Sequence, residues 1–417
     1  MIFLKPLLLF FLFVLISSFG LPIVIDLILF LIIIFLIKFD NIILFNINLI
    51  ILVSIIVLNF YLVKNIDENK IFYRAHERFF LSEEFKYIKN INYKMKMPHG
   101  DIPAIDVCYK KQNIFQPREQ LFITDENGFR NDKFKINQAD IILIGDSFIA
   151  GSSNSQEYIP ANILSKLINK NVYAITSIST PEEYERHISE NLNNFKKTAK
   201  LYLFYFSGND FIYETTQEKN FKYYNLIPIN PIKYNIRFGY ERLERNKDKF
   251  HIKYLKKFYE KNYFYKKIRP QSQRFFKKAL IKWTKTCPIK YKSIKNNDVG
   301  FYYNFFEHNF NSKTYIIKDK EILKRIDKIF YIPTKFEVYR DFIENADNSN
   351  SIKVKNFEFL KKEYNLINKD VYDLTETLIR QASNSLKNNK FIFWKDDTHW
   401  NSDGIQAAME FVAQIIE

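Results

Sequence analysis

Cysteine is almost absent from this chain of 417 residues. The two that it has, Cys108 and Cys287, have a spacing that matches no metal site. They can form one disulfide in an oxidising compartment or stay apart as buried thiols, so they do not decide the compartment. The sequence also has no internal repeat and no long low-complexity linker. At 47% hydrophobic residues, the chain is long enough for one large domain plus a membrane region, or for two domains.

Glycine is also scarce, with nine residues in the whole chain. Glycine is needed where the backbone turns sharply or comes close to a ligand. Five of the nine fall inside or beside a few short motifs, which marks those segments as a candidate site. These five are Gly128, Gly145, Gly151, Gly208 and Gly404.

The first motif is Gly145-Asp146-Ser147, which closes the apolar run at residues 141–144. Such a run ending in glycine and aspartate predicts a buried parallel strand that stops at a tight turn. Ligands bind at the carboxyl ends of strands in open α/β sheets. We therefore expect Ser147 to face a crevice.

The second motif, near the C-terminus, is Asp396-Asp397-Thr398-His399-Trp400-Asn401. A serine hydroxyl is a poor nucleophile at neutral pH, so acyl transfer needs a histidine to take its proton and a carboxylate to orient that histidine. Ser147, His399 and one of Asp396 and Asp397 fit these roles. The other aspartate is expected to cap the following turn or helix.

A third motif, Ser207-Gly208-Asn209-Asp210, follows the predicted strand 201–206. The amide of Asn209 can donate a hydrogen bond to a developing oxyanion. Asp210 is expected to support the turn that presents Asn209.

In this order the motifs resemble the SGNH, or GDSL-type, hydrolase superfamily, with Gly-Asp-Ser, then Gly-x-Asn-Asp, then Asp-x-x-His. Residues 127–131 (Asn-Gly-Phe-Arg-Asn) and His-Trp-Asn-x-x-Gly at 399–404 are similar to its membrane-anchored bacterial branch. That branch includes alginate O-acetylation proteins and other cell-envelope acyltransferases. The resemblance covers residues from about 121 to 214 and from about 329 to 417. It implies an α/β fold, a flavodoxin-like three-layer sandwich with a parallel sheet.

The resemblance also implies an oxyanion hole formed by the backbone N–H of Ser147, the side chain of Asn209 and a donor after the second strand. The family usually has glycine at that last position, whereas Ser177 stands here. Serine still has a backbone N–H at this position. If that donor did not reach the oxyanion, its loss would cost about 100- to 1000-fold in rate. Asp396 is slightly preferred as the triad acid because most of the superfamily places it three residues before the histidine. The alginate-type proteins place it two before, as Asp397 stands.

Several further residues are expected to support this site. Arg130 is expected to anchor the loop beneath it or, second, to touch substrate. Trp400 either shields the site from water or belongs to the core. Gly145, Asp146 and Gly208 shape the turns. No metal or organic cofactor is implied, because triad chemistry needs none.

The first 64 residues are almost entirely apolar. A membrane-spanning helix needs about 20 apolar residues. Three candidate helices fit, at about 4–19, 22–38 and 42–63, with a single kinked helix or a re-entrant pair as alternatives. Flanking lysines leave the topology open. We expect a protein of the cytoplasmic membrane, with the catalytic domain placed outside the cytoplasm by the resemblance alone.

Between Arg242 and Lys295 the chain has 19 Lys or Arg against three acidic residues, which accounts for its net charge of +16. This segment is predicted to belong to an insertion at about 217–325 on the catalytic fold. Its interleaved aromatic residues suit anionic lipid headgroups or acidic glycans. A solvated helical insertion is an equal alternative. Nucleic acid is not expected for a membrane-bound chain.

The predicted organisation is a membrane region at 1–64, a linker or N-terminal extension at 65–120 and the hydrolase-like domain at 121–417. Strands are expected at 141–144, 172–176, 201–206, 329–332 and 390–393, and helices at 160–168, 181–197, 373–387 and 403–416. The hypothesis is a membrane-anchored serine esterase or acyltransferase that forms acyl-Ser147 and removes or transfers acetyl groups on envelope polysaccharide. The alternatives are a lipid esterase or lysophospholipase and an inactive glycan-binding protein of the same fold.

Overall fold

The structure, a computed structural model, describes residues 76, 79–81, 86–106, 112–132, 135–176, 180–214, 289–302, 311–344 and 356–416. All of them belong to one compact unit, Phe72–Glu218 with Cys287–Glu417. Within the described residues no helix is long and apolar enough to cross a membrane. The predicted spans, both cysteines, Ser177 and most of the basic segment 242–295 lie outside the described residues.

The centre of the unit is a five-stranded sheet in the order β13-β12-β7-β5-β6, with every neighbouring pair parallel. Read from β6, the strands follow one another as second, first, third, fourth and fifth along the chain. This is a doubly wound order of the flavodoxin type. The expected α/β class with a parallel sheet is therefore confirmed. The strands are β5 (Ile141–Gly145), β6 (Val172–Thr176), β7 (Lys200–Phe206), β12 (Ile326–Ile332) and β13 (Val371–Asp373).

The strands are mostly apolar because both faces of the sheet are covered. All residues of β5 and β6 are buried. Side chains alternate between two cores: Ile141 and Leu143 belong to one, whereas Ile142 and Ile144 belong to the other. The sheet therefore lies between two layers of helices.

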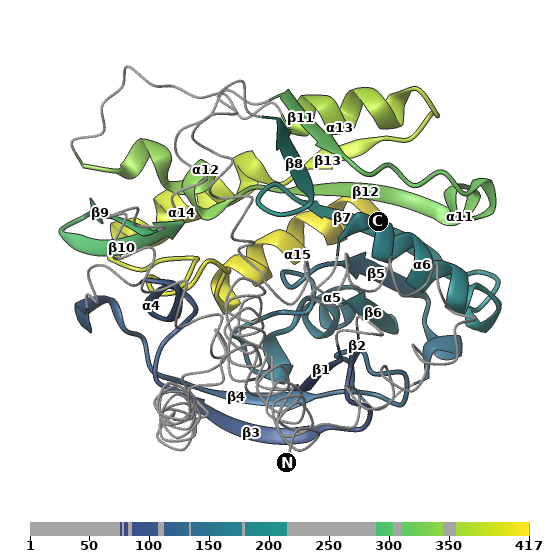
Figure 1. The fold of residues 1–417 in the computed structure, drawn as a ribbon, viewed down its shortest axis with the longest axis horizontal. Coiled ribbons are helices and arrows are strands. Elements are labelled where there is room, and N and C mark those ends of the chain that lie inside the picture. Colours follow the sequence, from purple (N-terminus) through teal and green to yellow (C-terminus); the bar gives the residue numbers. More distant parts are fainter. Residues whose placement is uncertain are drawn as a thin grey trace, which may run out of the picture. The chain divides into compact units, whose positions relative to one another are not determined.

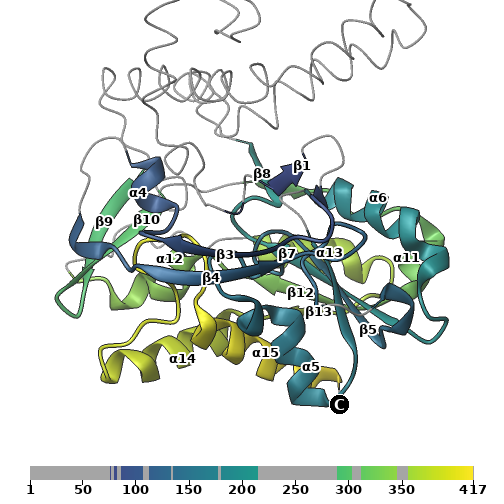
Figure 2. The ribbon, with the colours of Figure 1, turned by 90° about the horizontal axis from the view of Figure 1, so that it is seen from below.

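One core is closed by α5, α12, α14 and α15, and the other by α6, α11 and α13. Figures 1 and 2 show these layers, with α5, α14 and α15 on one side of the strands. Proline is the first residue of both α5 and α6, where its missing N–H costs nothing. The helices are α5 (Pro160–Ile168), α6 (Pro181–Asn191), α11 (Lys320–Arg325), α12 (Lys335–Tyr339), α13 (Asn356–Asn365), α14 (Thr375–Lys387) and α15 (Ser402–Ile416).

Four antiparallel strand pairs and a short helix surround this sandwich. The strand β3 (Asn92–Met97) and the helix α4 (Ile102–Ile105) come from the segment 65–120 that was predicted as a linker or extension, and β4 (Arg118–Ile123), which pairs with β3, crosses its end. The others are β1 (Phe80–Leu81) with β2 (Lys86–Tyr87), β8 (Phe211–Glu214) with β11 (Asn311–Thr314), and β9 (Ile289–Ile294) with β10 (Asn297–Tyr302).

Three element predictions were wrong in detail. Residues 390–393 form no strand, because Ile392 gives its N–H to the hydroxyl of Tyr339 and its C=O to Asn401. Only Phe393 makes a bridge, with Trp400. The helix predicted from 373 starts at Thr375, since the residues before it pair with β12 as β13. The helix predicted to 197 ends at Asn191.

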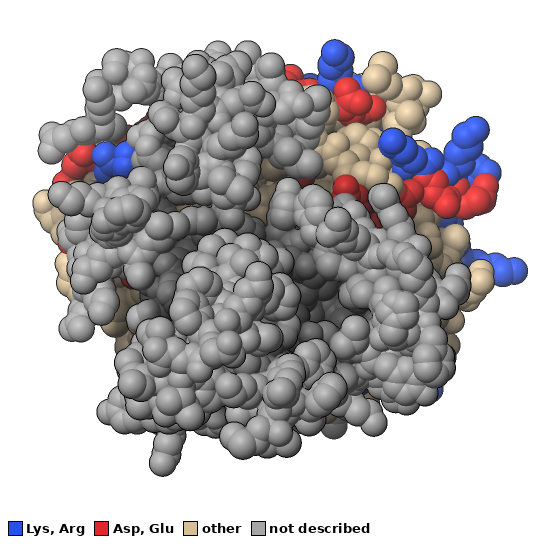
Figure 3. Space-filling view, viewed as in Figure 1, with Lys and Arg blue, Asp and Glu red and all other residues tan. Residues whose placement is uncertain are grey.

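The described surface carries both signs of charge. Where described residues are visible in Figure 3, basic and acidic side chains lie beside one another. Ion pairs such as Lys324 with Glu321 on α11, at 2.7 Å, and Arg186 with Glu183 on α6, at 2.8 Å, are of this kind. Exposed pairs of this type contribute little to stability.

Candidate active site

Ser147 lies just beyond the end of β5, where the strand order of the sheet reverses. The chain leaves β5 for β6 on one side and returns to β7 on the other. Ligands bind at such switch points. Gly145 is required in this turn, because a Cβ there would lie 2.6 Å from Cγ1 of Ile149. Asp146 fixes the turn by accepting the backbone N–H of Phe148 at 2.8 Å.

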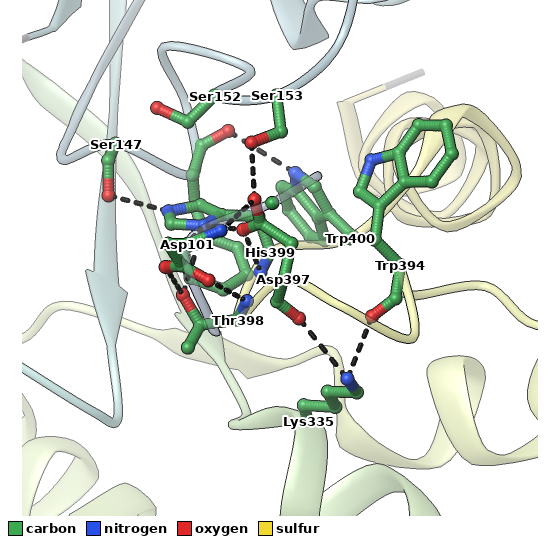
Figure 4. A network of polar contacts seen from close by, with 12 residues as sticks. Asp101, Ser147, Ser152, Ser153, Lys335, Trp394, Asp397, Thr398, His399 and Trp400 are labelled. Atoms are coloured by element: carbon green, nitrogen blue, oxygen red, sulfur yellow. Dashed lines mark hydrogen bonds and ion pairs between the residues drawn. The ribbon is translucent and has the colours of Figure 1, made fainter. Parts of the chain in front are cut away.

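Ser147, His399 and Asp397 form a continuous chain of hydrogen bonds (Figure 4). Oγ of Ser147 is 2.8 Å from Nε2 of His399, and Nδ1 of His399 is 2.8 Å from Oδ1 of Asp397. All three side chains are buried. The ring of Phe148 packs against the imidazole, with ring centroids 4.6 Å apart. This is the geometry of a serine nucleophile with its base and an orienting carboxylate.

The slight preference for Asp396 as the partner of His399 is corrected by the structure. The carboxylate of Asp396 points to a different set of donors: the backbone N–H groups of Gly100 and Gln116, both at 2.9 Å, and Nη1 of Arg118 at 3.0 Å. Asp396 therefore joins the loop that precedes His399 to the segment around β4.

Asp397 is held in place through its second oxygen. Oδ2 accepts the backbone N–H of Asp101 at 3.1 Å, the hydroxyl of Ser153 at 2.6 Å and Nη2 of Arg118 at 3.1 Å. Ser153 has a positive φ of 67°, an uncommon conformation for a residue other than glycine. These three donors fix the carboxylate and leave Oδ1 directed at His399.

A third buried carboxylate, that of Asp101, binds the loop that carries His399. It accepts the backbone N–H of Thr398 at 2.8 Å and the Thr398 hydroxyl at 2.5 Å. Its Oδ2 is 4.0 Å from Nδ1 of His399. Asp101 thus fixes the residue next to the histidine and adds negative charge near the imidazole.

Lys335, at the start of α12, is buried beneath the same loop. Its amine donates to the carbonyls of Trp394 at 2.7 Å, Gly300 at 2.8 Å, and Lys395 and Asp397 at 3.2 Å. Burial lowers the pKa of Lys335 to about 7, against the opposing influence of nearby carboxylates. The amine joins β10 to the loop that leads to His399.

Arg130 supports the loop after the nucleophile. Fully buried, it donates to the carbonyls of Ala150, Gly151, Leu121 and Asn154 and to Gln156. Burial lowers its pKa to about 10. These contacts place Arg130 beneath the site.

Trp400 lies in the core, with its ring N–H donating to the Phe148 carbonyl at 3.3 Å. Asp210 closes the turn after β7 by accepting the N–H of Phe206 at 2.8 Å and the hydroxyl of Tyr184 at 3.1 Å.

Of the three predicted oxyanion donors, the structure describes the two from Ser147 and Asn209. The backbone N–H of Ser147 is at the turn after β5, and Asn209, next to Gly208, is an exposed residue beyond the end of the neighbouring strand β7. Ser177 follows β6 outside the described residues. The described donors come from adjacent strand ends at the same edge of the sheet.

Asp101, Asp397 and His399 also offer donor atoms within 4.8 Å of one another, as a metal site requires. The atoms are already engaged, however, since both oxygens of Asp397 accept N–H or O–H groups and Nδ1 of His399 faces Oδ1 of Asp397. We therefore assign this cluster to the triad.

Sequence reasoning missed Asp101, Arg118, Ser153 and Lys335, none of which belongs to a motif. The scarcity of glycine was one feature of the sequence that could have pointed to this region. A Cβ at Gly100, which precedes Asp101, would lie 2.4 Å from the carbonyl oxygen of Asp396. Gly300 accepts from Lys335. Both glycines lie outside the motifs, yet both contact the site.

Comparisons of the chain with protein-family models, with curated proteins and with solved structures gave no match. The relationship to the SGNH superfamily therefore stays a proposal that rests on the motifs and on the geometry of the site.

Proposed function

We propose that the protein is a membrane-anchored serine esterase or acyltransferase of SGNH type. The hydrogen-bond chain from Ser147 through His399 to Asp397, with both contacts at 2.8 Å, carries this proposal. The strand order and the position of Ser147 at the switch point agree with it. The acyl group is proposed to be acetyl and the acceptor an envelope polysaccharide, by analogy with the similar bacterial branch.

The reaction proceeds in two halves. Oγ of Ser147 attacks the ester carbonyl carbon while Nε2 of His399 takes the hydroxyl proton. The ester C–O bond breaks, the leaving alcohol takes that proton and acyl-Ser147 remains. Water or a sugar hydroxyl then gives its proton to Nε2 and attacks the acyl carbon. Ser147 recovers its proton as it leaves.

His399 performs both proton transfers only if its orientation and tautomer are fixed. Asp397 accepts from Nδ1, so that Nε2 is the free acceptor for the serine proton. The Ser147 N–H and the Asn209 amide supply donors for the oxyanion in this proposal. Ser177 is expected to supply a further backbone N–H donor.

The test is labelling by a fluorophosphonate probe and turnover of p-nitrophenyl acetate by the full-length protein in detergent, with and without an oligosaccharide acceptor. Ser147→Ala is expected to abolish labelling and to reduce turnover at least about 1000-fold. Ser152→Ala is the matched control, since Ser152 is a buried serine of the same loop whose hydroxyl lies 3.5 Å from His76. It is expected to retain activity.

The outcomes separate the candidate functions. Faster p-nitrophenol release with a sugar acceptor favours a transferase, and no acceptor effect favours an esterase. Turnover of long-chain esters alone would favour a lipid esterase. If wild type and Ser147→Ala are equally inert toward probe and esters, the enzyme proposal is wrong. Membrane anchoring is tested separately by carbonate extraction of membranes from cells that produce the full chain.

A further inference from the structure

A pocket of about 400 Å³ lies beside the triad but is not its substrate crevice. Neither Ser147 nor His399 lines it. Ser153 and Trp394 do, and Figure 4 shows both on the far side of His399 from Ser147. The volume falls in the range of about 300–1,000 Å³ that is usual for small-molecule sites.

The walls of the pocket combine aromatic rings with hydroxyl and amide groups. Tyr158 is 46% exposed, and Trp394 is half-buried with the guanidinium of Arg118 4.2 Å from its ring centroid. The remaining polar wall consists of Ser153, Asn154, Ser155, Ser402, Lys94, Glu119 and Glu157. Rings that offer an apolar face beside many hydrogen-bonding groups suit a molecule with both C–H faces and hydroxyls.

The charges in the pocket argue against an acidic ligand. Both of its cations are already paired, Lys94 with Glu119 at 2.5 Å and Arg118 with Asp396 and Asp397 at 3.0 and 3.1 Å. The exposed carboxylate of Glu157 adds negative charge. An anionic ligand would find no unpaired cation in this lining and would be repelled by Glu157. A neutral polyol would not be repelled.

Two buried N–H groups of the lining side chains have no hydrogen-bond partner among the described residues. They are Nε of Arg118 and the ring N–H of Trp394. The side chain of Arg118 is only 6% exposed. A buried donor without a partner is costly. Because both atoms have almost no exposed surface, a molecule in the pocket would reach them only if the wall shifts.

We propose that this pocket is a binding subsite for a neutral sugar unit, distinct from the acyl site at Ser147. The subsite is linked to the triad, because Arg118 and Ser153 line the pocket and also donate to Asp397. The sugar stacks on Tyr158, because the Arg118 guanidinium already covers one face of the Trp394 ring. Its binding does not depend on acyl chemistry at Ser147.

The test is isothermal titration of full-length protein in detergent with neutral cello-, malto- and N-acetylchito-oligosaccharides and with acidic oligogalacturonate. At least one neutral oligosaccharide is expected to bind wild type and Ser147→Ala equally. Tyr158→Ala is expected to weaken that binding about five- to tenfold, and Tyr158→Phe to restore most of it. Tyr93→Ala is the matched control, since Tyr93 is 42% exposed and does not line the pocket.

Absence of binding by every neutral oligosaccharide would overturn the proposal, as would binding that Tyr158→Ala leaves unchanged while the variant melts like wild type. Binding of oligogalacturonate alone would show an acidic-ligand site and would also overturn it. Because titration reads binding and not turnover, an inert Ser147 and an absent sugar subsite give different results.

Discussion

Exchanging the two neighbouring aspartates for asparagine separates a triad carboxylate from a structural one. Asp396 and Asp397 are both fully buried, both accept from Arg118, and both accept backbone N–H groups. In either variant an amide NH₂ replaces one acceptor oxygen and leaves a buried donor unmatched, at a cost of about 1–3 kcal/mol in the free energy of unfolding. We therefore expect Asp396→Asn and Asp397→Asn to lose similar stability.

Their activities are expected to differ strongly. Oδ1 of Asp397 accepts from Nδ1 of His399, which keeps Nε2 free for the proton of Ser147. The asparagine amide favours the other tautomer, with the proton on Nε2, so kcat of Asp397→Asn should fall about 10⁴-fold. Hydrogen bonds of Asp396 go to Gly100, Gln116 and Arg118 instead. Asp396→Asn keeps the tautomer and should lose less than about tenfold.

The assay is the initial rate of p-nitrophenyl acetate hydrolysis by full-length variants, with Ser147→Ala as the background and urea unfolding as the measure of stability. Equal losses of kcat in the two aspartate variants at equal stability would refute the assignment of Asp397. A larger loss in Asp396→Asn would reverse the assignment.

The remaining predictions concern stability. Because burial lowers the pKa of Lys335 from 10.5 to about 7, the unfolded chain binds up to one more proton between these values. The free energy of unfolding should therefore rise with pH in that window by up to about 1.4 kcal/mol per unit from this group. Urea unfolding of Lys335→Met should lack this contribution, and an unchanged slope would contradict the lowered pKa. Gly404→Ala places a Cβ 2.2 Å from the carbonyl oxygen of Ile392 and should cost about 1–3 kcal/mol. A melting temperature equal to that of wild type would contradict the tight contact.

The sequence predicted four of the five strands of the sheet, because buried parallel strands are continuous apolar runs. The fifth strand, β13, was missed, and the strand predicted at 390–393 is absent. The predicted strand 172–176 and helix 160–168 match β6 and α5 residue for residue. Ser147 and His399 were found because each lies in a motif at the end of a predicted element. The choice between Asp396 and Asp397 could not be made from spacing, since it depends on which carboxylate the donors of Arg118 and Gly100 leave free.

The segment before the first motif was the largest omission. It was predicted as a linker or N-terminal extension, yet it supplies Asp101, Gln116 and Arg118 to the loop that carries His399. These contacts join residues nearly 300 positions apart. Such contacts leave no periodic pattern in the local sequence, because they depend on the tertiary fold alone.

Three buried carboxylates and two basic groups, Arg118 and Lys335, lie together around the loop that carries His399. Asp101, Asp396 and Asp397 bring three carboxylates to one side of His399, and Arg118, with its single charge, pairs with two of them. These carboxylates outnumber the basic groups even when Lys335 is protonated, so the cluster keeps an excess of negative charge. That excess stabilises the imidazolium that forms when His399 takes the serine proton. Protonation of Lys335 at lower pH reduces it, so the buried amine ties the electrostatics of the proposed base to pH.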